Sequence, residues 1–251
     1  MKIIDLSATI CSAPPDSAVF DAIHISYSSH AEGAAQASAL LNVPVTAFRN
    51  DEGWATEEIT RMGTHSSTHV DAPWHYNSSI DGWPAETIDR LPLEWFFGNG
   101  VVLDMTHKSR GNPVTGDDIR SALDAIGYAL KPLDIVLIHT GCDKYYGASD
   151  YIFHGPGVTA EATIWLIDQG IRVMGIDAWG WDEPLDLEAA RAAEKQEKGV
   201  FWAAHQVGRS YSHIERLVNL SALPAHGFKV ACFPLKIKGA SAGPARVVAI
   251  L

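Results

Sequence analysis

Three apolar runs alternate with two segments of helical spacing: VVLDM at 101–105, TGDDIRSALDAIGYA at 115–129, DIVLIH at 134–139, TAEATIWLIDQ at 159–169 and VMGI at 173–176. Ile119, Leu123 and Ile126 fall on one stripe of the first helical segment, and Gly170 follows the second. This order of strand, helix, strand, helix, strand predicts an α/β protein with a partly parallel sheet. Continuous apolar runs are typical of strands that are covered on both faces.

Outside this stretch, three apolar or β-branched runs predict further strands, at 2–6, 228–233 and 246–251. Two long segments, 14–58 and 180–199, lack clear periodicity. Such segments in compact domains usually serve as lids or as arms onto a partner subunit. Within the second, residues 187–198 are good helix formers of mixed charge and also fit an exposed helix. No composition break divides the chain, so we expect one domain over 1–251.

The composition narrows the class of protein. Apolar residues make up 47% and charged residues 20% of the 251, which excludes a disordered, collagen-like or coiled-coil chain. Nineteen Lys and Arg against thirty Asp and Glu give a formal charge of −11, which argues against a nucleic-acid partner. No apolar run is long enough to span a membrane. Three widely spaced cysteines suit reduced thiols, so we expect a cytoplasmic protein.

Potential metal ligands are concentrated in HSSTHVDAPWH, residues 65–75. In a strand, His69 and Asp71 would share a face about 6.6 Å apart, near enough to converge on one ion. In a continued strand, His65 would lie about 13 Å from His69, so a common ion requires a bend between them. The intervening serines favour such a bend.

His75 is expected just beyond this strand, because Pro73 cannot donate to a sheet and keeps the preceding residue extended. There it would be a third or fourth ligand, a general acid or base beside the metal, or a structural residue. A divalent metal held this way keeps an open position for water and lowers the pKa of that water toward neutral. Ligands that offer only nitrogen and oxygen suit Zn²⁺ or Mn²⁺, and the pattern predicts hydrolysis of a polarised carbonyl.

The motif resembles His-x-Gly-Thr-His-x-Asp-x-Pro-x-His, the pattern of the cyclase family of metal-dependent hydrolases, which includes bacterial kynurenine formamidases and isatin hydrolases. The resemblance continues through IIDLSATI near the start and through residues 204–251, so it covers essentially the whole chain. Ser67 stands where the pattern has glycine. The resemblance implies a swivelling β/β/α-like fold, with a mixed sheet curled toward a barrel and flanking helices, and a homodimer or homotetramer.

The resemblance also implies a set of metal ligands, namely His65, His69, Asp71, His205 and Glu215. It makes His75 the proton donor and acceptor, with Glu215 as a second catalytic group. In the formamidase branch, the groups that resemble His205 and Glu215 complete a second metal site, which Asp71 and Glu215 would bridge. Here His205 and Glu215 are ten positions apart, which is shorter than in that branch, so the number of metals stays open.

Without the resemblance, these downstream residues have other interpretations. Glu215 lies in HIERLVNL and also fits an exposed helix carboxylate, and His205 follows FWAA and also fits a buried core histidine. Gln206 is an alternative ligand, and His213 fits either a structural or a substrate-facing role.

Three residues are candidates for substrate binding, namely Trp74, Thr140 and Trp179. Thr140 and Trp179 follow predicted strands, and ligands in α/β sheets gather at the carboxyl ends of strands. The tryptophans would form an aromatic wall, although tryptophan also often belongs to a core.

These observations favour a metal-dependent hydrolase of a small molecule. A metal-activated water would open a small cyclic amide or lactam, or cleave an N-acyl amide, at a carbon–nitrogen bond other than a peptide bond. A metal-dependent cyclase or lyase that acts on a polyketide-like or lactone substrate is the alternative. A binding protein that uses its metal to hold a carboxylate is a third possibility.

Overall fold

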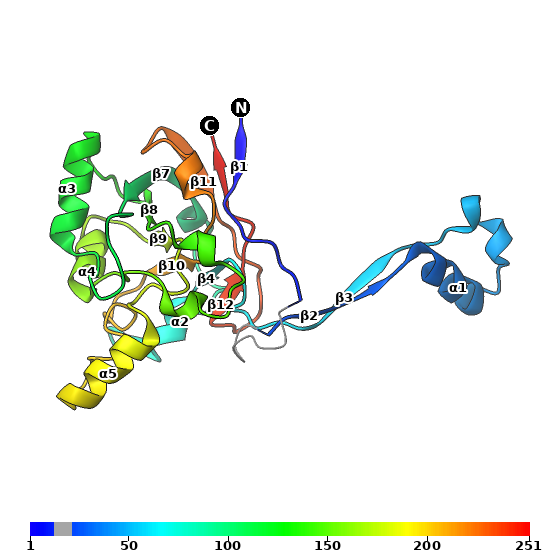
Figure 1. Cartoon of the computed structure of the whole chain (residues 1–251), viewed down its shortest axis with the longest axis horizontal. Helices are drawn as coiled ribbons and strands as arrows, with labels where there is room; N and C mark the ends of the chain where they lie inside the picture. Colours follow the sequence, from blue (N-terminus) through cyan, green and yellow to red (C-terminus); the bar gives the residue numbers. More distant parts are fainter. Residues whose placement is uncertain (13–21) are drawn as a thin grey trace. The chain divides into compact units, whose positions relative to one another are not determined.

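The computed structural model describes residues 1–12 and 22–251, which form two compact units (Figure 1). The larger unit comprises Met1–Thr9 and Thr64–Leu251, and the smaller unit comprises Ile10–Gly63. The first residues of the expected arm at 14–58 lie outside the described residues. The expectation of a single domain over 1–251, with lids or arms, stays a prediction.

A nine-stranded mixed sheet, curled into a half-barrel, is the frame of the larger unit. Its strands, in spatial order, are β1 (Ile3–Asp5), β13 (Val248–Ile250), β11 (Phe228–Ala231), β7 (Phe97–Asp104), β8 (Ile135–His139), β9 (Val173–Ile176), β10 (Ser212–Glu215), β4 (His69–Asp71) and β12 (Ala242–Pro244). Strands β7 to β10 are parallel, and the pairs on either side of them are antiparallel. The predicted α/β fold with a partly parallel sheet is confirmed.

The central strands are buried on both faces, as their continuous apolar sequences predict. In β7, Val101 and Leu103 pack into one hydrophobic core, whereas Val102 packs into a second core across the sheet. The first core also contains the apolar stripe of helix α3 (Gly116–Ile126) and residues of helix α4 (Ala160–Asp168). The sheet is therefore a layer packed between two cores, which is a suitable support for a site on one of its faces.

The two predicted crossover helices form where the sequence places them, with small differences at their ends. Thr115 caps α3 by accepting the N–H of Asp118. The helix ends before the predicted residue 129, because Gly127 adopts a left-handed backbone with a φ of 64°. Thr159 caps α4 in the same way.

Residues 180–199 contain helix α5 (Leu185–Lys195), two residues ahead of the exposed helix expected at 187–198. It ends where Gln196 takes a left-handed φ of 54°. Residues 181–184, which precede it, are buried. Strand β10 was not predicted, and the interpretation of Glu215 as an exposed helix carboxylate is wrong, because Glu215 is a buried strand residue.

The smaller unit is more regular than its sequence indicates. Strands β2 (His24–Ser28) and β3 (Thr56–Arg61) form an antiparallel ribbon, and helix α1 (His30–Leu41) begins with a capping box between Ser29 and Glu32. Helix α1 has few apolar residues of helical period because alanines form its buried side.

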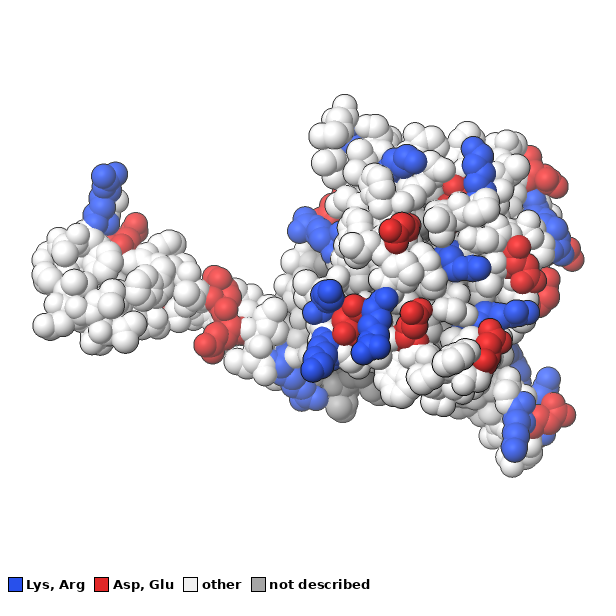
Figure 2. Space-filling model, turned by 180° about the vertical axis from the view of Figure 1, so that it is seen from behind, with Lys and Arg blue, Asp and Glu red and all other residues white. Residues whose placement is uncertain are grey.

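Short elements complete the described chain: α2 (Pro73–Tyr76), β5 (Ser79–Ile80), β6 (Trp83–Pro84), and the 3₁₀ helices η2 (Val45–Ala47), η3 (Arg49–Asp51), η4 (Leu93–Phe96), η5 (Cys142–Tyr145), η6 (Tyr151–Phe153) and η7 (Leu220–Ala222). In the part of the chain that the structure describes, we find no helix with the length and apolar character to cross a membrane. On the face seen in Figure 2, basic and acidic side chains are interspersed, which differs from the continuous basic surface of a nucleic-acid-binding protein.

Candidate metal centre

Two neighbouring strands carry the same short pattern of histidine, aliphatic residue and acid, HVD in β4 and HIE in β10. The strands are antiparallel, with Glu215 opposite His69 and Ile214 opposite Val70. Val70 and Ile214 pack into the second core. Because side chains alternate along a strand, the histidine and acid of each strand point to the opposite face. This confirms the predicted strand at His69–Asp71 and adds a second strand beside it.

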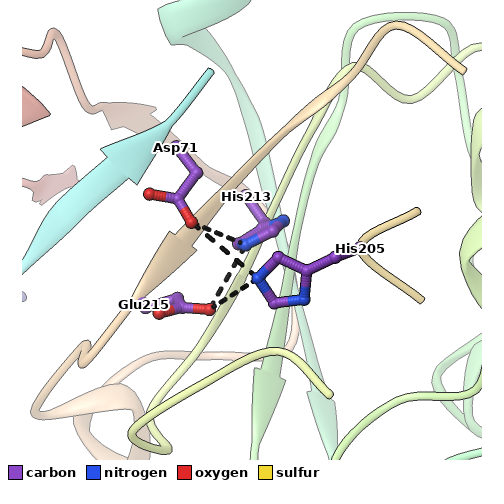
Figure 3. Close-up of side chains that lie close together, drawn as sticks. All are labelled: Asp71, His205, His213 and Glu215. Atoms are coloured by element: carbon purple, nitrogen blue, oxygen red, sulfur yellow. Dashed lines mark ion pairs between the residues drawn. The ribbon is translucent and has the colours of Figure 1, made fainter. Parts of the chain in front are cut away.

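Asp71, His205, His213 and Glu215 converge on one point, and their ligand atoms all lie within 4.8 Å of one another (Figure 3). His213 Nε2 is 3.0 Å from Asp71 Oδ2 and 3.2 Å from Glu215 Oε1. His205 Nε2 is 4.0 Å and 3.6 Å from the same two oxygens. Four tetrahedral ligands at about 2.1 Å from an ion lie about 3.4 Å apart, so these spacings suit a metal.

The other oxygens of the two acids face the histidines of the HSSTHVDAPWH motif. Asp71 Oδ1 is 2.8 Å from His65 Nδ1 and 3.2 Å from His69 Nε2. Glu215 Oε2 is 3.6 Å from His69 Nε2. We call His65 and His69 the upstream pair and His205 and His213 the downstream pair. Asp71 presents one oxygen to each pair, and Glu215 presents one to His69 and one to the downstream pair.

The predicted bend before His69 is present and brings His65 back toward Asp71. The chain turns at residues 64–68, and Ser67 adopts a left-handed φ of 58°. Glycine takes that conformation without strain, which gives a physical reason for the glycine of the family pattern at this position. His65 Nε2 contacts Ser241 Oγ at 2.9 Å, which leaves Nδ1 directed at the acid.

Helix α2 places His75 beside the cluster. Ala72 is extended, as the sequence predicts, and Pro73 is the first residue of the helix, which was not predicted. His75 Nε2 lies 3.9 Å from Asp71 Oδ2, and the His75 and His65 rings are 3.9 Å apart. Burial lowers the pKa of His75 to about 4, and the neighbouring histidines contribute while Asp71 opposes them. His75 is therefore neutral and able to accept a proton.

The charges of the cluster favour positive charge beside the two acids. Burial disfavours ionisation of Asp71 and Glu215, yet the histidines hold the pKa of Asp71 well below its ordinary range and that of Glu215 at about 2. Burial also disfavours a charged His213, but the two carboxylates raise its pKa to about 9. The two buried carboxylates therefore stabilise a positive charge at the point where their oxygens meet.

The cyclase family model matches residues 4–183 of the chain. The chain belongs to the cyclase family. The resemblance predicted from the HSSTHVDAPWH motif is thereby confirmed.

Relatives of this chain include named enzymes. It is 28% identical to an isatin hydrolase of Roseibium aggregatum over 201 residues, which cover 76% of this chain and 73% of the relative. It is 29% identical to a kynurenine formamidase of Maricaulis maris over 210 residues, which cover 81% and 88%. A solved isatin hydrolase A from Labrenzia aggregata, bound to benzyl benzoate, has a TM-score of 0.74 and 25% identity, covering 100% of this chain and 93% of that one.

A further observation fits a divalent metal at the cluster. Several of its buried polar atoms have no hydrogen bond among the described residues, namely His69 Nε2, both Asp71 carboxylate oxygens and both His213 ring nitrogens. Unpartnered buried polar atoms are strongly disfavoured in proteins, and all of these belong to residues of the two acid-bearing strands. A metal ion would satisfy those that face it, and nitrogen and oxygen donors are its natural ligands.

Sequence reasoning did not assign His213 to the metal. Its ring is fully buried, roughly parallel to the rings of Trp181 and Tyr76, with centroid separations of 5.7 Å to each. The spacing His213-Ile-Glu215 repeats that of His69-Val-Asp71, and this repetition is the sequence pattern from which it is predictable. His205 is buried at the cluster, whereas the alternative ligand Gln206 is exposed.

The three candidate substrate residues lie in different surroundings. The Thr140 hydroxyl donates to Asp177 Oδ1 at 2.6 Å, and the Trp179 ring packs against the guanidinium of Arg216 at 4.7 Å. Trp74 lines an open groove of about 780 Å³ with residues of β5, β6 and their surroundings. Substrate binding by Trp74, Thr140 and Trp179 stays a prediction.

Proposed function

We propose that this protein is a metal-dependent hydrolase that opens a small cyclic amide or lactam, or cleaves an N-acyl amide. The observation that carries the proposal is the convergence of Asp71, Glu215 and four histidines, with buried atoms that lack hydrogen bonds. Both Zn²⁺ and Mn²⁺ suit these donors. The isatin hydrolase and kynurenine formamidase relatives support a reaction at an amide carbon–nitrogen bond.

We further propose two metal positions that share Asp71 and Glu215. The upstream pair faces Asp71 Oδ1, and His69 also faces Glu215 Oε2. The downstream pair faces the other oxygen of each acid. A metal at these positions supplies Lewis-acid polarisation of a carbonyl and a water of lowered pKa.

The burial of the histidines supports a direction of substrate entry and a role for His75. His69 and His213 are inaccessible, whereas the His65 and His75 side chains are 28% and 21% exposed and form the rim of the cluster. A carbonyl substrate would therefore approach over the two rim histidines. The neutral Nε2 of His75 takes a proton from the attacking water and returns it to the leaving nitrogen.

Substitution of His75 separates this role from metal binding. We expect His75→Gln to keep the metal content of the wild type and to lower kcat by about 100- to 10,000-fold, which is the usual contribution of general acid–base catalysis. His226→Gln is the matched control, because His226 is an exposed histidine of the same unit. Equal kcat for His75→Gln and the wild type would contradict the assignment.

A substrate screen in ¹⁸O-labelled water tests the reaction class. The panel contains lactams, N-formyl and N-acetyl arylamines, and lactones, each assayed with Zn²⁺ and with Mn²⁺. We expect one labelled oxygen in the product carboxylate, because hydrolysis requires it. Turnover without label would instead favour the alternative, a cyclase or lyase that acts on a polyketide-like or lactone substrate. Tight binding without turnover would favour a binding protein.

We also propose a homodimer or homotetramer. The smaller unit is short, yet it exposes large apolar side chains, namely Tyr27, Leu40, Leu41 and Ile59. Exposed apolar groups of this kind often mark protein interfaces. Light scattering coupled to size-exclusion chromatography is expected to give two or four chains, and a monomer at micromolar concentration would contradict this.

A further inference from the structure

The His205 ring meets a second buried carboxylate on the side away from the cluster. Asp182 Oδ2 is in very close contact with His205 Nδ1. The same carboxylate accepts the backbone N–H of Ala204 at 2.8 Å and that of His205 at 2.9 Å. The side chains of both residues are 5% exposed, so water does not compete for these contacts.

This contact determines which ring nitrogen carries the proton. A neutral imidazole has one N–H, and only the other nitrogen can bind a metal. A carboxylate accepts hydrogen bonds and does not donate them, so Asp182 holds the N–H at Nδ1. Nε2 then keeps its lone pair, and this is the atom that faces Asp71 and Glu215.

Neighbouring side chains hold this arrangement in place. The Trp202 ring stacks on the His205 ring with a centroid separation of 4.7 Å and an angle of 7°. The backbone N–H of Trp202 donates to Glu188 Oε2 at 3.4 Å, and Trp202 has a left-handed φ of 58°. Burial and the charge of Asp182 raise the pKa of Glu188 to about 8, so near neutral pH Glu188 is protonated and donates to Asp182.

We propose that Asp182 is a positioning residue that fixes His205 in the tautomer whose Nε2 is free to bind metal at the downstream position. The inference rests on the proposed function, because it assigns a role to the metal ligand His205. Carboxylates behind a metal-binding histidine fix its tautomer and orientation, and their loss usually lowers metal affinity by about 10- to 100-fold.

A purely structural role for Asp182 is the competing interpretation, since the carboxylate also caps two backbone N–H groups. The Asp182→Asn variant distinguishes the structural role from the positioning role. The asparagine oxygen still accepts a backbone N–H, but its amide group donates where the carboxylate accepted. Facing His205, that amide favours a proton on Nε2, which prevents metal binding. Glu183→Gln is the matched control, because Glu183 is equally buried and pairs with Arg191 instead of His205.

Two measurements on the ¹⁵N-labelled protein test the proposal. Long-range ¹H–¹⁵N spectra of the metal-free wild type report the tautomer of each histidine, and a His205→Gln spectrum identifies the signals of His205. Calorimetric titration with Mn²⁺ then gives the affinity of each position for the wild type, Asp182→Asn and Glu183→Gln.

We expect an Nδ1–H tautomer for His205, an affinity about 10- to 100-fold lower at one position in Asp182→Asn, and wild-type affinity in Glu183→Gln. An Nε2–H tautomer in the wild type, or unchanged affinity in Asp182→Asn, would overturn the proposal. The tautomer of His205 in the wild-type spectrum tests the proposal even if the Asp182→Asn variant does not fold. Failure of the proposed function is distinct, because the wild type itself would then bind no Mn²⁺.

Discussion

Strands β4 and β10 bring nearly the same side chains to the candidate metal centre, but their ligands are organised differently along the chain. The upstream pair and Asp71 come from seven consecutive residues, where one bend and one strand set their geometry. In the downstream pair, His213 reaches Asp71 through sheet pairing, whereas His205 reaches it from a loop. The half of the site with the upstream pair is thus local in sequence. The half with the downstream pair depends on the assembled fold.

This difference has a physical consequence for the two halves. The local half requires a left-handed backbone at Ser67. The backbone strain therefore lies within the HSSTHVDAPWH motif itself. The other half needs segments on both sides of α5, because Asp182 precedes the helix and holds His205 in the loop after it. Asp71 belongs to both halves, and substitutions in the two halves are expected to differ in what they remove.

The largest effect is expected for Asp71→Asn, which weakens the shared ligand. Asparagine has one carbonyl oxygen and no charge, so both metal positions lose a ligand and the histidines lose their counter-charge. We expect metal affinity to fall by more than about 100-fold at both positions, beyond the usual effect of a residue behind a ligand. Plasma mass spectrometry measures the metal that each chain retains after dialysis. The control is Asp124→Asn, a substitution at an exposed position. Loss at one position alone would contradict the shared role of Asp71.

Next in size, His69→Gln and His213→Gln are expected to remove one metal each, because each histidine belongs to one half. The metal content per chain should fall by half in either variant, and the double variant should bind none. His226→Gln is the control for loss of an exposed histidine. Full metal content in His213→Gln, as measured by plasma mass spectrometry, would contradict the equivalence of the HVD and HIE strands.

These two strands also illustrate what the sequence predicts. HVD was predictable because Pro73 ends its strand and His65 and His75 flank it, so several ligands stand together. The HIE strand was not predictable. Ile214 and Leu217 in HIERLVNL fit both a short strand and a helical stripe, and a strand of four residues is too short to decide between these two periods. Its burial follows from pairing with β4 and β9, which no local pattern contains.

The same reasoning applies to the fold. Strands β7 to β9 and the helices between them were predictable, because continuous apolar runs and capping residues are local features. Helix α1 was not, because alanines pack on its buried side and give weak periodicity. The sequence of the smaller unit therefore appeared irregular.

A smaller effect tests the strain in the local half. Ser67→Ala and Ser67→Gly both lose the hydroxyl that accepts from Tyr146 at 3.0 Å and donates to Ala8 at 3.3 Å. Only glycine also relieves the left-handed backbone, so we expect Ser67→Gly to be more stable than Ser67→Ala by about 1 kcal/mol. Urea denaturation measures the difference. Greater stability of Ser67→Ala would contradict the strain.

A further prediction concerns pH and the residues that hold His205. Folding raises the pKa of Glu188 from 4.5 to about 8, mainly through burial. The protonated form therefore stabilises the fold, fully below about pH 4.5, and this contribution is lost as the pH rises through about 8. We expect Glu188→Gln to gain stability relative to the wild type between about pH 5 and pH 8. Urea denaturation at both pH values checks this, with the exposed Glu194→Gln as control, and a pH-independent difference would contradict it.

The central claim is that a metal lies between the two strands, and anomalous diffraction from crystals soaked in Mn²⁺ or Zn²⁺ tests it most directly. We predict an anomalous peak about 2.0–2.3 Å from Asp71 Oδ2, Glu215 Oε1 and the Nε2 atoms of the downstream pair. Saturating metal with no anomalous peak among these four residues would contradict the account.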